Sequence, residues 1–433
     1  MRGARKLLTI GWIVAIASVP STGAAQALPA QTRLAAVDVV GLQRLTKADV
    51  VSALGLKIGA LITVADLEHA AERLSRSGVV SEVTFRYTFK GTDLTATFTI
   101  VEAVTSTRVV FDNFPWFTDD ELTASVARRL PGFSGRTANS GEAVDQISGA
   151  LSDLLKARGL QGSVVYLFFL DTRTGSGSHM FKVSGIPLPI CSVDFRGVQP
   201  ALEPSVRTEA SPLIGREYSR VSSYEFLKAT LTPFYRQRGH LRIQVVATTG
   251  KIAVGSASAA SGVTVTATVE EGLAYSWKGT RWAGNAAIAS SVLDKVLGFK
   301  DGDIADGLKL DNGLRQAERS YGRVGHLHAT VTATPRFDDT SRTATFDVSV
   351  AEGPQFRMGT LTVTGVGEET ARKIREHWKL KPGDVYDAEY QAQFPGELAR
   401  ANPQLLAGLG SMKFKTAPNS GVWTVDVALS FGS

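Results

Sequence analysis

The chain has 433 residues, of which 43% are hydrophobic and 8% aromatic. This length exceeds that of one ordinary domain, and the low aromatic content favours several small cores over one large core. Its 47 basic residues outnumber its 41 acidic ones, but no long basic run follows Lys6, which argues against a nucleic-acid-binding protein. The single cysteine, Cys191, excludes an intramolecular disulfide. We expect Cys191 to be a small, half-buried residue at the head of a strand rather than a nucleophile.

Residues 1–27 have the pattern of a secretory signal peptide. Three basic residues (Arg2, Arg5 and Lys6) precede an apolar run from Leu7 to Val19, and Ala25-Gln26-Ala27 resembles a cleavage site. The apolar run is shorter than the roughly 20 residues that span a bilayer, which disfavours a membrane anchor. Removal of the segment leaves 44 basic and 41 acidic residues, a formal charge of +3. We therefore expect a mature chain outside the cytoplasm, without a transmembrane segment.

Four glycines recur at regular intervals after the signal peptide: Gly78, Gly159, Gly239 and Gly325, at steps of 81, 80 and 86 residues. Each closes a basic helix-like segment and precedes a β-branched run. A period near 80 suits a small complete domain rather than a helical-hairpin repeat. The sequence therefore predicts five domains, with limits at 33–103, 104–187, 188–272, 273–354 and 355–433.

Each unit opens with alternating residues that end at a glycine: Val37–Gly41, Val193–Gly197, Tyr275–Gly279 and Leu361–Gly365. In the second unit Val109–Phe114 takes this place, with Asn113 in the turn. Alternation that stops at Gly or Asn predicts a strand and a tight turn, because these residues tolerate positive φ. A short amphipathic helix follows, such as Thr46–Leu54 or Glu121–Leu130. It ends at a glycine-containing bend: Lys57–Gly59, Pro131–Phe133, Leu213–Gly215, Asp301–Asp303 and Lys381–Asp384.

A second helix and a hairpin complete the unit. The helix is predicted at Leu67–Ser77, Ala143–Arg158, Ser223–Arg238 and Leu308–Arg323, each with an apolar stripe and a following glycine cap. The hairpins join Val79–Phe89 to Leu94–Val101, Leu241–Thr248 to Val263–Val269, and Leu327–Thr334 to Thr343–Val350. The fold class is therefore α+β: a tandem array of five small β-α-α-β-β domains, each a three-stranded sheet with two helices on one face.

No motif in the chain indicates catalysis. Asp301-Gly302-Asp303 lacks the spaced oxygen ligands and the closing glutamate of a calcium loop. His326-Leu327-His328 on a strand would point both imidazoles to one face, but two ligands do not make a metal site, and His240 lies far away in sequence. The chain has no G-x-S-x-G, P-loop or dinucleotide-binding turn, and Gly175–Ser178 fits a flexible hairpin connection. We expect no enzymatic activity, no cofactor and no metal.

The order strand, helix, helix, strand, strand resembles the POTRA (polypeptide-transport-associated) domain, from about Arg33 to Ser433. The marks that carry the resemblance are Arg238–Leu241, Val324–Leu327, Lys381–Tyr386 and the two junctions Glu271-Gly272 and Glu352-Gly353. The resemblance is to the periplasmic part of outer-membrane β-barrel assembly factors of the bacterial surface antigen family. A barrel would need many further alternating segments of about ten residues, and we identify none.

The resemblance implies a periplasmic protein, associated with the outer membrane, that binds or scaffolds polypeptide in outer-membrane protein assembly or secretion. Its partners would be unfolded or extended outer-membrane polypeptides, or an outer-membrane barrel or lipoprotein. Strand addition to an exposed sheet edge is the implied mode of binding. The alternative is a structural spacer, or an accessory subunit that docks onto a separate outer-membrane barrel protein.

The resemblance also implies that the first strand of each closing hairpin is the free edge. In the second unit this strand is an uninterrupted apolar run, comprising Val164, Val165, Tyr166, Leu167, Phe168, Phe169 and Leu170. Such a run favours a strand buried on both faces, and the alternative is an exposed docking site. Charges would discourage self-pairing of the corresponding strands elsewhere, namely Arg86 and Lys90 in the first unit, and Lys413 and Lys415 in the fifth.

Overall fold

A computed structural model of the chain describes residues 32–43, 45–90, 92–102, 106–130, 133–138, 142–171, 176–253, 262–406 and 410–432. The expected signal peptide at 1–27 lies outside these residues, as do Pro131 and Gly132 of one expected bend. Contacts divide the chain into two compact units. The N-terminal unit runs to Asp194 and includes Ala210–Glu225 and Thr248–Ala267, and the C-terminal unit comprises the remainder. None of the helices in the described ranges is long and apolar enough to cross a membrane.

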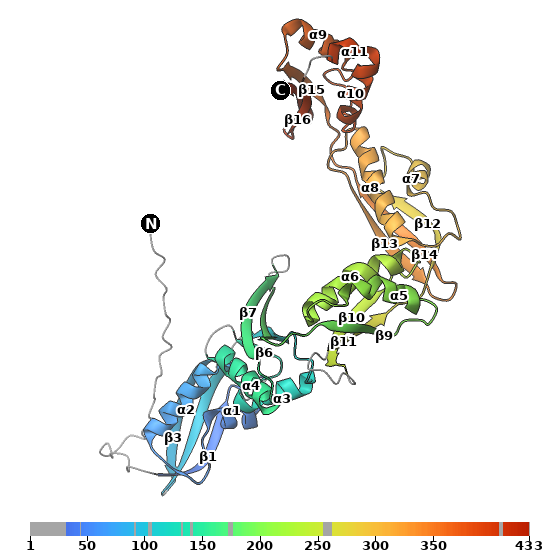
Figure 1. The fold of residues 1–433 in the computed structure, drawn as a ribbon. Helices are drawn as coiled ribbons and strands as arrows, with labels where there is room; N and C mark the ends of the chain where they lie inside the picture. Colours follow the sequence, from blue (N-terminus) through green and yellow to red (C-terminus); the bar gives the residue numbers. More distant parts are fainter. Residues whose placement is uncertain are drawn as a thin grey trace. The chain divides into compact units, whose positions relative to one another are not determined.

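The first sheet has the strand order β2-β1-β4-β3. Its strands are β1 (Thr32–Val40), β2 (Leu61–Ile62), β3 (Val80–Lys90) and β4 (Asp93–Glu102). Strand β1 runs parallel to β4, while β2 and β3 are antiparallel to their neighbours. The helices α1 (Lys47–Leu54) and α2 (Val64–Arg76) lie on one face of this sheet (Figure 1). Both begin with a capping box in which a threonine and an aspartate satisfy each other's backbone N–H groups.

The second sheet has the order β6-β5-β8-β7. It consists of β5 (Ser106–Phe111), β6 (Arg136–Ala138), β7 (Ser163–Asp171) and β8 (Ser176–Ser184). The helices α3 (Asp119–Arg129) and α4 (Ala143–Ala157) supply Leu122, Ile147 and Leu151 to a core that includes Phe111 and Phe181. The expectation of three strands is therefore wrong for the first two sheets, because the bend after the first helix adds a short strand, β2 or β6, to the opening strand.

The third sheet has the order β10-β11-β9, with β9 (Ile190–Arg196), β10 (Gln244–Ile252) and β11 (Val263–Glu270). Between β9 and β10 the chain forms α5 (Glu203–Ala210), a short 3₁₀ helix at Ser211–Leu213 and α6 (Arg220–Arg236). The apolar stripe predicted for α6 is buried, since Leu227, Leu231, Phe234 and Tyr235 are at most 6% exposed.

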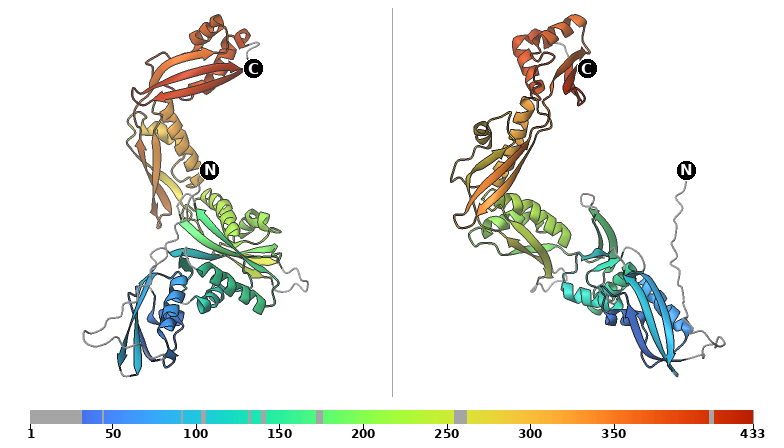
Figure 2. Two further views of the ribbon diagram at one scale, coloured as in Figure 1. Left: turned by 90° about the vertical axis from the view of Figure 1, so that its left-hand side faces the viewer. Right: turned by 180° about the vertical axis from the view of Figure 1, so that it is seen from behind.

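Two further sheets lie in the C-terminal unit. One, of order β12-β14-β13, contains β12 (Ser276–Ala283), β13 (Thr330–Asp338) and β14 (Thr343–Ala351), with α7 (Ser290–Leu297) and α8 (Gly307–Arg323). The other, of order β15-β17-β16, contains β15 (Arg357–Thr364), β16 (Ser411–Asn419) and β17 (Thr424–Gly432), with α9 (Glu368–His377), α10 (Tyr390–Ala401) and α11 (Pro403–Leu406). Figure 2 shows the helices of this last sheet gathered on one of its faces. Aromatic side chains pack in both cores: Trp277 stacks on Phe299 and Phe346, whereas Trp378 meets Tyr390 and Phe394 edge-on.

The fold is therefore mixed α+β with several small sheets and helices, as predicted. A fivefold repeat of β-α-α-β-β domains, and the limits of those domains, remain predictions. One expected turn is wrong. Strand β12 does not stop at Gly279 but continues past a register shift to Ala283, and Gly284 follows with a φ of 80°. A Cβ at Gly284 would lie 2.2 Å from the Val350 carbonyl oxygen, so only glycine fits this close approach of two backbones.

Asn113 replaces that glycine in the second unit by a different device. Its side-chain amide donates to the Val183 carbonyl oxygen at 3.0 Å, and its amide oxygen accepts from the Val183 N–H at 2.6 Å. The side chain thus extends the β5–β8 ladder by one pair of hydrogen bonds. This explains why asparagine stands where the other units have glycine.

Candidate functional site

The two edges of each sheet differ in their access to another strand. At the opening strand, the bend after the first helix blocks the edge, through β2 and β6 or through the single bridges Pro189–Glu217, Ser276–Ile304 and Arg357–Val385. The opposite edge is formed by the first strand of the closing hairpin: β3, β7, β10, β13 or β16. These five strands end their sheets in the described part of the chain, and they are the edges that the sequence analysis proposed as free.

The backbone of β7 presents alternate residues to the free edge. The Phe181 carbonyl of β8 accepts from the Asp112 N–H at 2.9 Å, so the polar groups of Phe181 point towards β5. Tyr166 lies opposite Phe181 in the antiparallel register, and its N–H and C=O must therefore point away from β8. Strand alternation gives Val164, Phe168 and Leu170 the same outward direction.

The inner part of β7 is anchored to the core. Val164 and Tyr166 pack against the cluster that contains Phe181. The Tyr166 hydroxyl is 2.9 Å from Nδ1 of His179, whose side chain is 2% exposed. Burial raises the pKa of Tyr166 and lowers the pKa of His179. The Phe168 ring contacts His179 and covers Gly177, where an added Cβ would lie 2.5 Å from a ring atom. These contacts fix the strand along one face.

The outer part of β7 is exposed on both faces. Leu167 is 46% exposed, Phe168 48%, Phe169 57% and Leu170 52%. Leu167 and Phe169 lie on one face of the strand, while Phe168 and Leu170 lie on the other. The interpretation as a strand buried on both faces is therefore wrong for these four residues. The core stops near Tyr166, and β8 places Met180 and Ser178 opposite Leu167 and Phe169.

Three other free edges carry features that oppose pairing. Arg86 and Lys90 are exposed on β3, and Lys413 and Lys415 lie on β16. Prolines interrupt two edges, at Pro335 in β13 and Pro418 in β16. The Arg342 carbonyl accepts from the Ser276 N–H, so the backbone polar groups of Arg342 point towards β12. Those of Phe346, four positions later on β14, point the same way. Pro335 lies opposite Phe346 in the antiparallel register, and its backbone nitrogen therefore points outward. An outward proline removes a donor from the edge. From Ser163 to Leu170, β7 contains neither charge nor proline.

The histidines serve local packing. Nδ1 of His240 lies 3.1 Å from the Gly272 carbonyl oxygen, Nδ1 of His326 lies 3.0 Å from that of Gly353, and His328 packs edge-on to Phe356. His326 and His328 lie in the turn after α8, so their expected placement on a strand is wrong. No group of three or more His, Cys, Asp or Glu side chains within the described ranges could hold a metal ion. Cys191 is exposed on β9 rather than half-buried.

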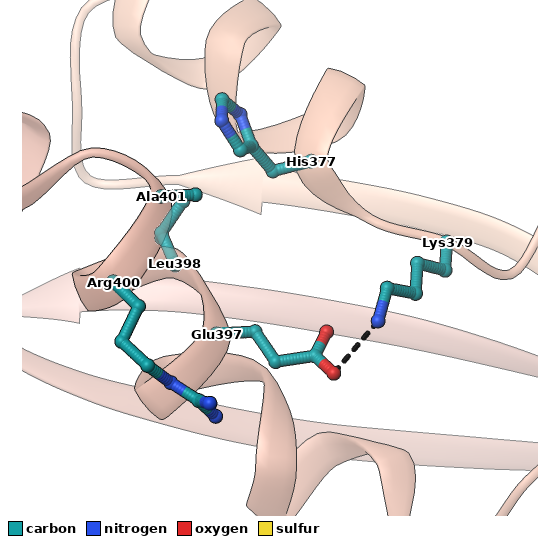
Figure 3. Close-up of a pocket in the computed structure, with 6 residues that line it drawn as sticks. All are labelled: His377, Lys379, Glu397, Leu398, Arg400 and Ala401. Atoms are coloured by element: carbon teal, nitrogen blue, oxygen red, sulfur yellow. Dashed lines mark hydrogen bonds and ion pairs between the residues drawn. The ribbon is translucent and has the colours of Figure 1, made fainter.

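A pocket of about 460 Å³ lies beside α10 and the end of α9. Figure 3 shows its lining residues, which are His377, Lys379, Glu397, Leu398, Arg400 and Ala401. The Lys379 ammonium is 2.7 Å from the Glu397 carboxylate, a contact that raises the pKa of Lys379. Nδ1 of His377 lies 2.8 Å from the Lys373 carbonyl oxygen, and Arg400 donates to the Gly396 carbonyl oxygen. Because these side chains bind one another or their own helices, the pocket shows no arrangement specific for a ligand.

Sequence reasoning missed the role of the junction glutamates. Glu102 and Glu271 are 4% and 5% exposed. Glu102 accepts from the N–H groups of Gln43 and Leu45, and Glu271 accepts from the Gln199 N–H at 2.9 Å and the Tyr235 hydroxyl at 2.6 Å. Glu352 accepts in the same way from the Ala287 N–H. Each glutamate thus holds the turn after an opening strand, and its recurrence at the end of the closing strand was the signal available in the sequence.

Comparison with known proteins matches one segment of the chain to a family model. The POTRA family model, described as "Surface antigen variable number repeat", matches residues 275–353, which contain β12, α7, α8, β13 and β14. A protein of Treponema pallidum (strain Nichols) named "Putative outer membrane protein assembly factor" is 21% identical over 233 residues, which are 52% of this chain and 28% of that protein. The chain therefore spans less than a third of the length of this relative.

Solved structures give similar matches. The crystal structure of BamA POTRA3-5 from Haemophilus influenzae is 18% identical, with a TM-score of 0.41, over 57% of this chain and 96% of that one. The N-terminal domain of Omp85 from Thermosynechococcus elongatus is 17% identical, with a TM-score of 0.27, over 57% of this chain and 98% of that one. Residues 275–353 thus match the POTRA family model, and parts of the chain are similar to these solved POTRA structures.

Proposed function

We propose that this chain is a periplasmic, non-enzymatic protein that binds extended polypeptide during outer-membrane protein assembly or secretion. In this proposal the chain is an array of five POTRA-like domains, and clients bind by strand addition to free sheet edges. The principal site is β7, through Val164, Val165, Tyr166, Leu167, Phe168 and Phe169. The observation that carries the proposal is the edge of β7 from Ser163 to Leu170, which contains neither charge nor proline and whose outer side chains are about half exposed.

Strand addition suits a client of variable sequence, because the main chain supplies most of the hydrogen bonds. Val164, Tyr166, Phe168 and Leu170 offer four N–H and four C=O groups to an added strand. Each new hydrogen bond contributes about 1 kcal/mol, and the ordering of the client offsets much of the sum. The exposed leucines and phenylalanines add apolar contact on both faces. We expect micromolar binding, which allows a client to be released.

The proposed role of this chain in outer-membrane assembly rests on its similarity to other proteins. The POTRA match at 275–353 and the assembly-factor relative support it, and the relative's name describes that role for the relative alone. A protein that holds clients by backbone pairing needs no catalytic group. This accords with histidines and acids that are used for packing and capping.

Proline substitution at an outward-pointing residue tests the proposal. Phe168→Pro removes one edge donor and none of the hydrogen bonds to β8, because the Phe168 N–H points outward, although it also removes the ring that contacts His179. Val165→Pro is a poorer test, since the Val165 N–H faces β8 and its loss would damage the hairpin itself. Thr416→Pro in β16 is the matched control, because it removes an outward donor from an edge that already carries Pro418.

The probe is a fluorescein-labelled decapeptide of alternating threonine and valine, with binding to the mature chain measured by fluorescence anisotropy. We expect Phe168→Pro to weaken binding about tenfold, the equivalent of one or two lost hydrogen bonds, and Thr416→Pro to leave it unchanged. Equal binding by all three proteins would refute β7 as the site. A chain that binds no extended peptide but retains one folded outer-membrane partner from a periplasmic extract would favour the spacer or accessory-subunit alternative.

A further inference from the structure

We infer that β7 also pairs with β7 of a second copy of this chain, antiparallel and about a twofold axis that passes beside Leu167. Such a pair would join two four-stranded sheets into one continuous sheet. It would also cover the edge that the proposed function assigns to clients, so the chain would cap its own binding site. The pairing itself does not depend on that function, whereas its competition with clients does.

The register follows from the directions of the backbone groups. Val164, Tyr166, Phe168 and Leu170 point outward, so only registers that set even-numbered residues opposite one another form hydrogen bonds. Full overlap of Ser163–Asp171 with its copy places the axis at the central residue, Leu167. Val164 then pairs with Leu170 of the second copy and Tyr166 with its Phe168. All four outward residues pair in this register.

The side chains match in the same register. On the helix face, Tyr166 meets a phenylalanine and Val164 meets a leucine. On the other face, Val165 meets Phe169, and Leu167 meets its own copy. Aromatic and β-branched cross-strand pairs each contribute roughly 0.2–1 kcal/mol. A twofold axis perpendicular to the sheet keeps the faces aligned, so that the half-exposed Phe168, Phe169 and Leu170 of one copy lie against Tyr166, Val165 and Val164 of the other.

Charge does not oppose this contact. Lys182 lies beside Val165 on β8, and the two copies of Lys182 are separated by three strand spacings of about 4.8 Å and an offset of four residues. This places the two Lys182 residues roughly 20 Å apart, about two and a half times the Debye length at physiological ionic strength. By contrast, the edges β3 and β16 carry exposed cations, Arg86 and Lys90 on β3 and Lys413 and Lys415 on β16, which oppose self-pairing.

The exposed area predicts a weak dimer. Four side chains that are each about half exposed amount to on the order of 400 Å² per copy. A stable interface of standard size buries about 800 Å² per partner. We therefore expect dissociation in the micromolar range, so that a client at similar concentration displaces the second copy.

Disulfide trapping tests the register. Leu167→Cys is made in a Cys191→Ser background, because Cys191 is exposed and is the one cysteine of the chain. At the axis, residue 167 forms a non-hydrogen-bonded pair with Cα atoms about 4.5 Å apart, within disulfide range. Phe169→Cys in the same background is the control, because its two copies lie about 13 Å apart along the strands.

We expect oxidation of the mature Leu167→Cys chain at 50 µM to give at least tenfold more covalent dimer than oxidation of Phe169→Cys, by non-reducing electrophoresis. Equal yields from the two variants, or no dimer from Leu167→Cys, would overturn the inference. Leu167→Lys supplies a second readout, since it sets two ammonium groups against each other at the axis. Sedimentation velocity should show the parent chain self-associating between 1 and 200 µM and Leu167→Lys remaining monomeric. Matching sedimentation of the two would also overturn it.

The decapeptide separates this inference from the proposed function. If both hold, the peptide lowers the yield of Leu167→Cys dimer. A peptide that binds the parent chain without affecting the dimer would place the client elsewhere and leave the dimer standing. A chain that binds peptide but fails the disulfide test would retain the proposed function and lose the second copy.

Discussion

Replacing Glu271 by alanine tests whether the junction glutamates hold the third sheet together. The Glu271 carboxylate accepts from the Tyr235 hydroxyl at 2.6 Å and from the Gln199 N–H at 2.9 Å. Burial and Glu271 together raise the pKa of Tyr235 far above its ordinary value, so this hydroxyl remains a donor at any physiological pH. Alanine leaves the fully buried Tyr235 hydroxyl without its acceptor.

The expected cost follows from these two contacts. A buried donor that loses its partner costs about 1–3 kcal/mol, and hydrogen bonds to a charged acceptor lie near the top of that range. Gln199 is exposed, so its N–H regains a hydrogen bond to water and contributes less. We therefore expect Glu271→Ala to lower the free energy of local opening by about 3 kcal/mol. This corresponds to a roughly hundredfold increase in the equilibrium constant for opening.

Hydrogen–deuterium exchange of the mature chain, read on peptides from α6 and β11, measures this change without isolating a domain. Glu270→Ala is the matched control, because it removes the same charge from an exposed neighbour, and we expect an effect below about 0.5 kcal/mol. Tyr235→Phe in the Glu271→Ala background should restore more than about 1 kcal/mol, since the orphaned hydroxyl is gone. Equal exchange in the two single variants would refute the reasoning.

Two further predictions concern the second and fourth sheets. Burial holds the pKa of His179 below its ordinary value of 6.5, so the unfolded state binds the proton more readily. The stability of the β7–β8 hairpin should therefore fall as the pH drops below 6.5, until the pH passes the lowered pKa. Hydrogen–deuterium exchange of the hairpin between pH 7.5 and 5 measures this fall. A His179→Leu chain with the same dependence of stability on pH would contradict the prediction. Gly284→Ala combines backbone strain with a steric clash, because its Cβ would lie 2.2 Å from the Val350 carbonyl oxygen. Gly302→Ala has the strain alone, because Gly302 has a similar φ of 86° and open space around it. We expect Gly302→Ala to cost about 1–2 kcal/mol and Gly284→Ala at least twice that, by the loss of exchange protection on β14; similar losses would show that strain alone matters.

Local patterns in the sequence were sufficient for several helices, of which α8 is an example. Apolar spacing and the following glycine predicted a helix at Leu308–Arg323, and α8 begins one residue earlier, at Gly307. The prediction is accurate because both signals arise within the helix or next to it. The same approach misplaced the end of β12. Gly279 and Gly284 both stand near the end of an alternating run, and the choice between them depends on a bulge against β14, a contact between residues more than 60 positions apart.

The exposure of β7 could not be predicted for a related reason. An apolar run indicates side chains that favour burial, but it does not show which part of the protein buries them. Burial here depends on tertiary packing: the core ends near Tyr166, while the strand continues to Asp171. The junction glutamates were visible in the sequence as a recurring acid. Their burial depends on a tyrosine and a turn that the chain brings together from at least 36 residues away.

The topology makes the free edge unavoidable, and this is why the composition of the edge carries information about function. The bend after the first helix closes the opening-strand side, so the hairpin strand on the other side is left unpaired whatever its sequence. Where that strand carries lysine, arginine or an outward proline, the features oppose association, as in β3, β13 and β16. The corresponding part of β7, Leu167–Leu170, is apolar, uncharged and about half exposed, and it lies outside the core cluster of its sheet. The proposed pairing of β7 with a client or with a second copy would account for this difference in composition.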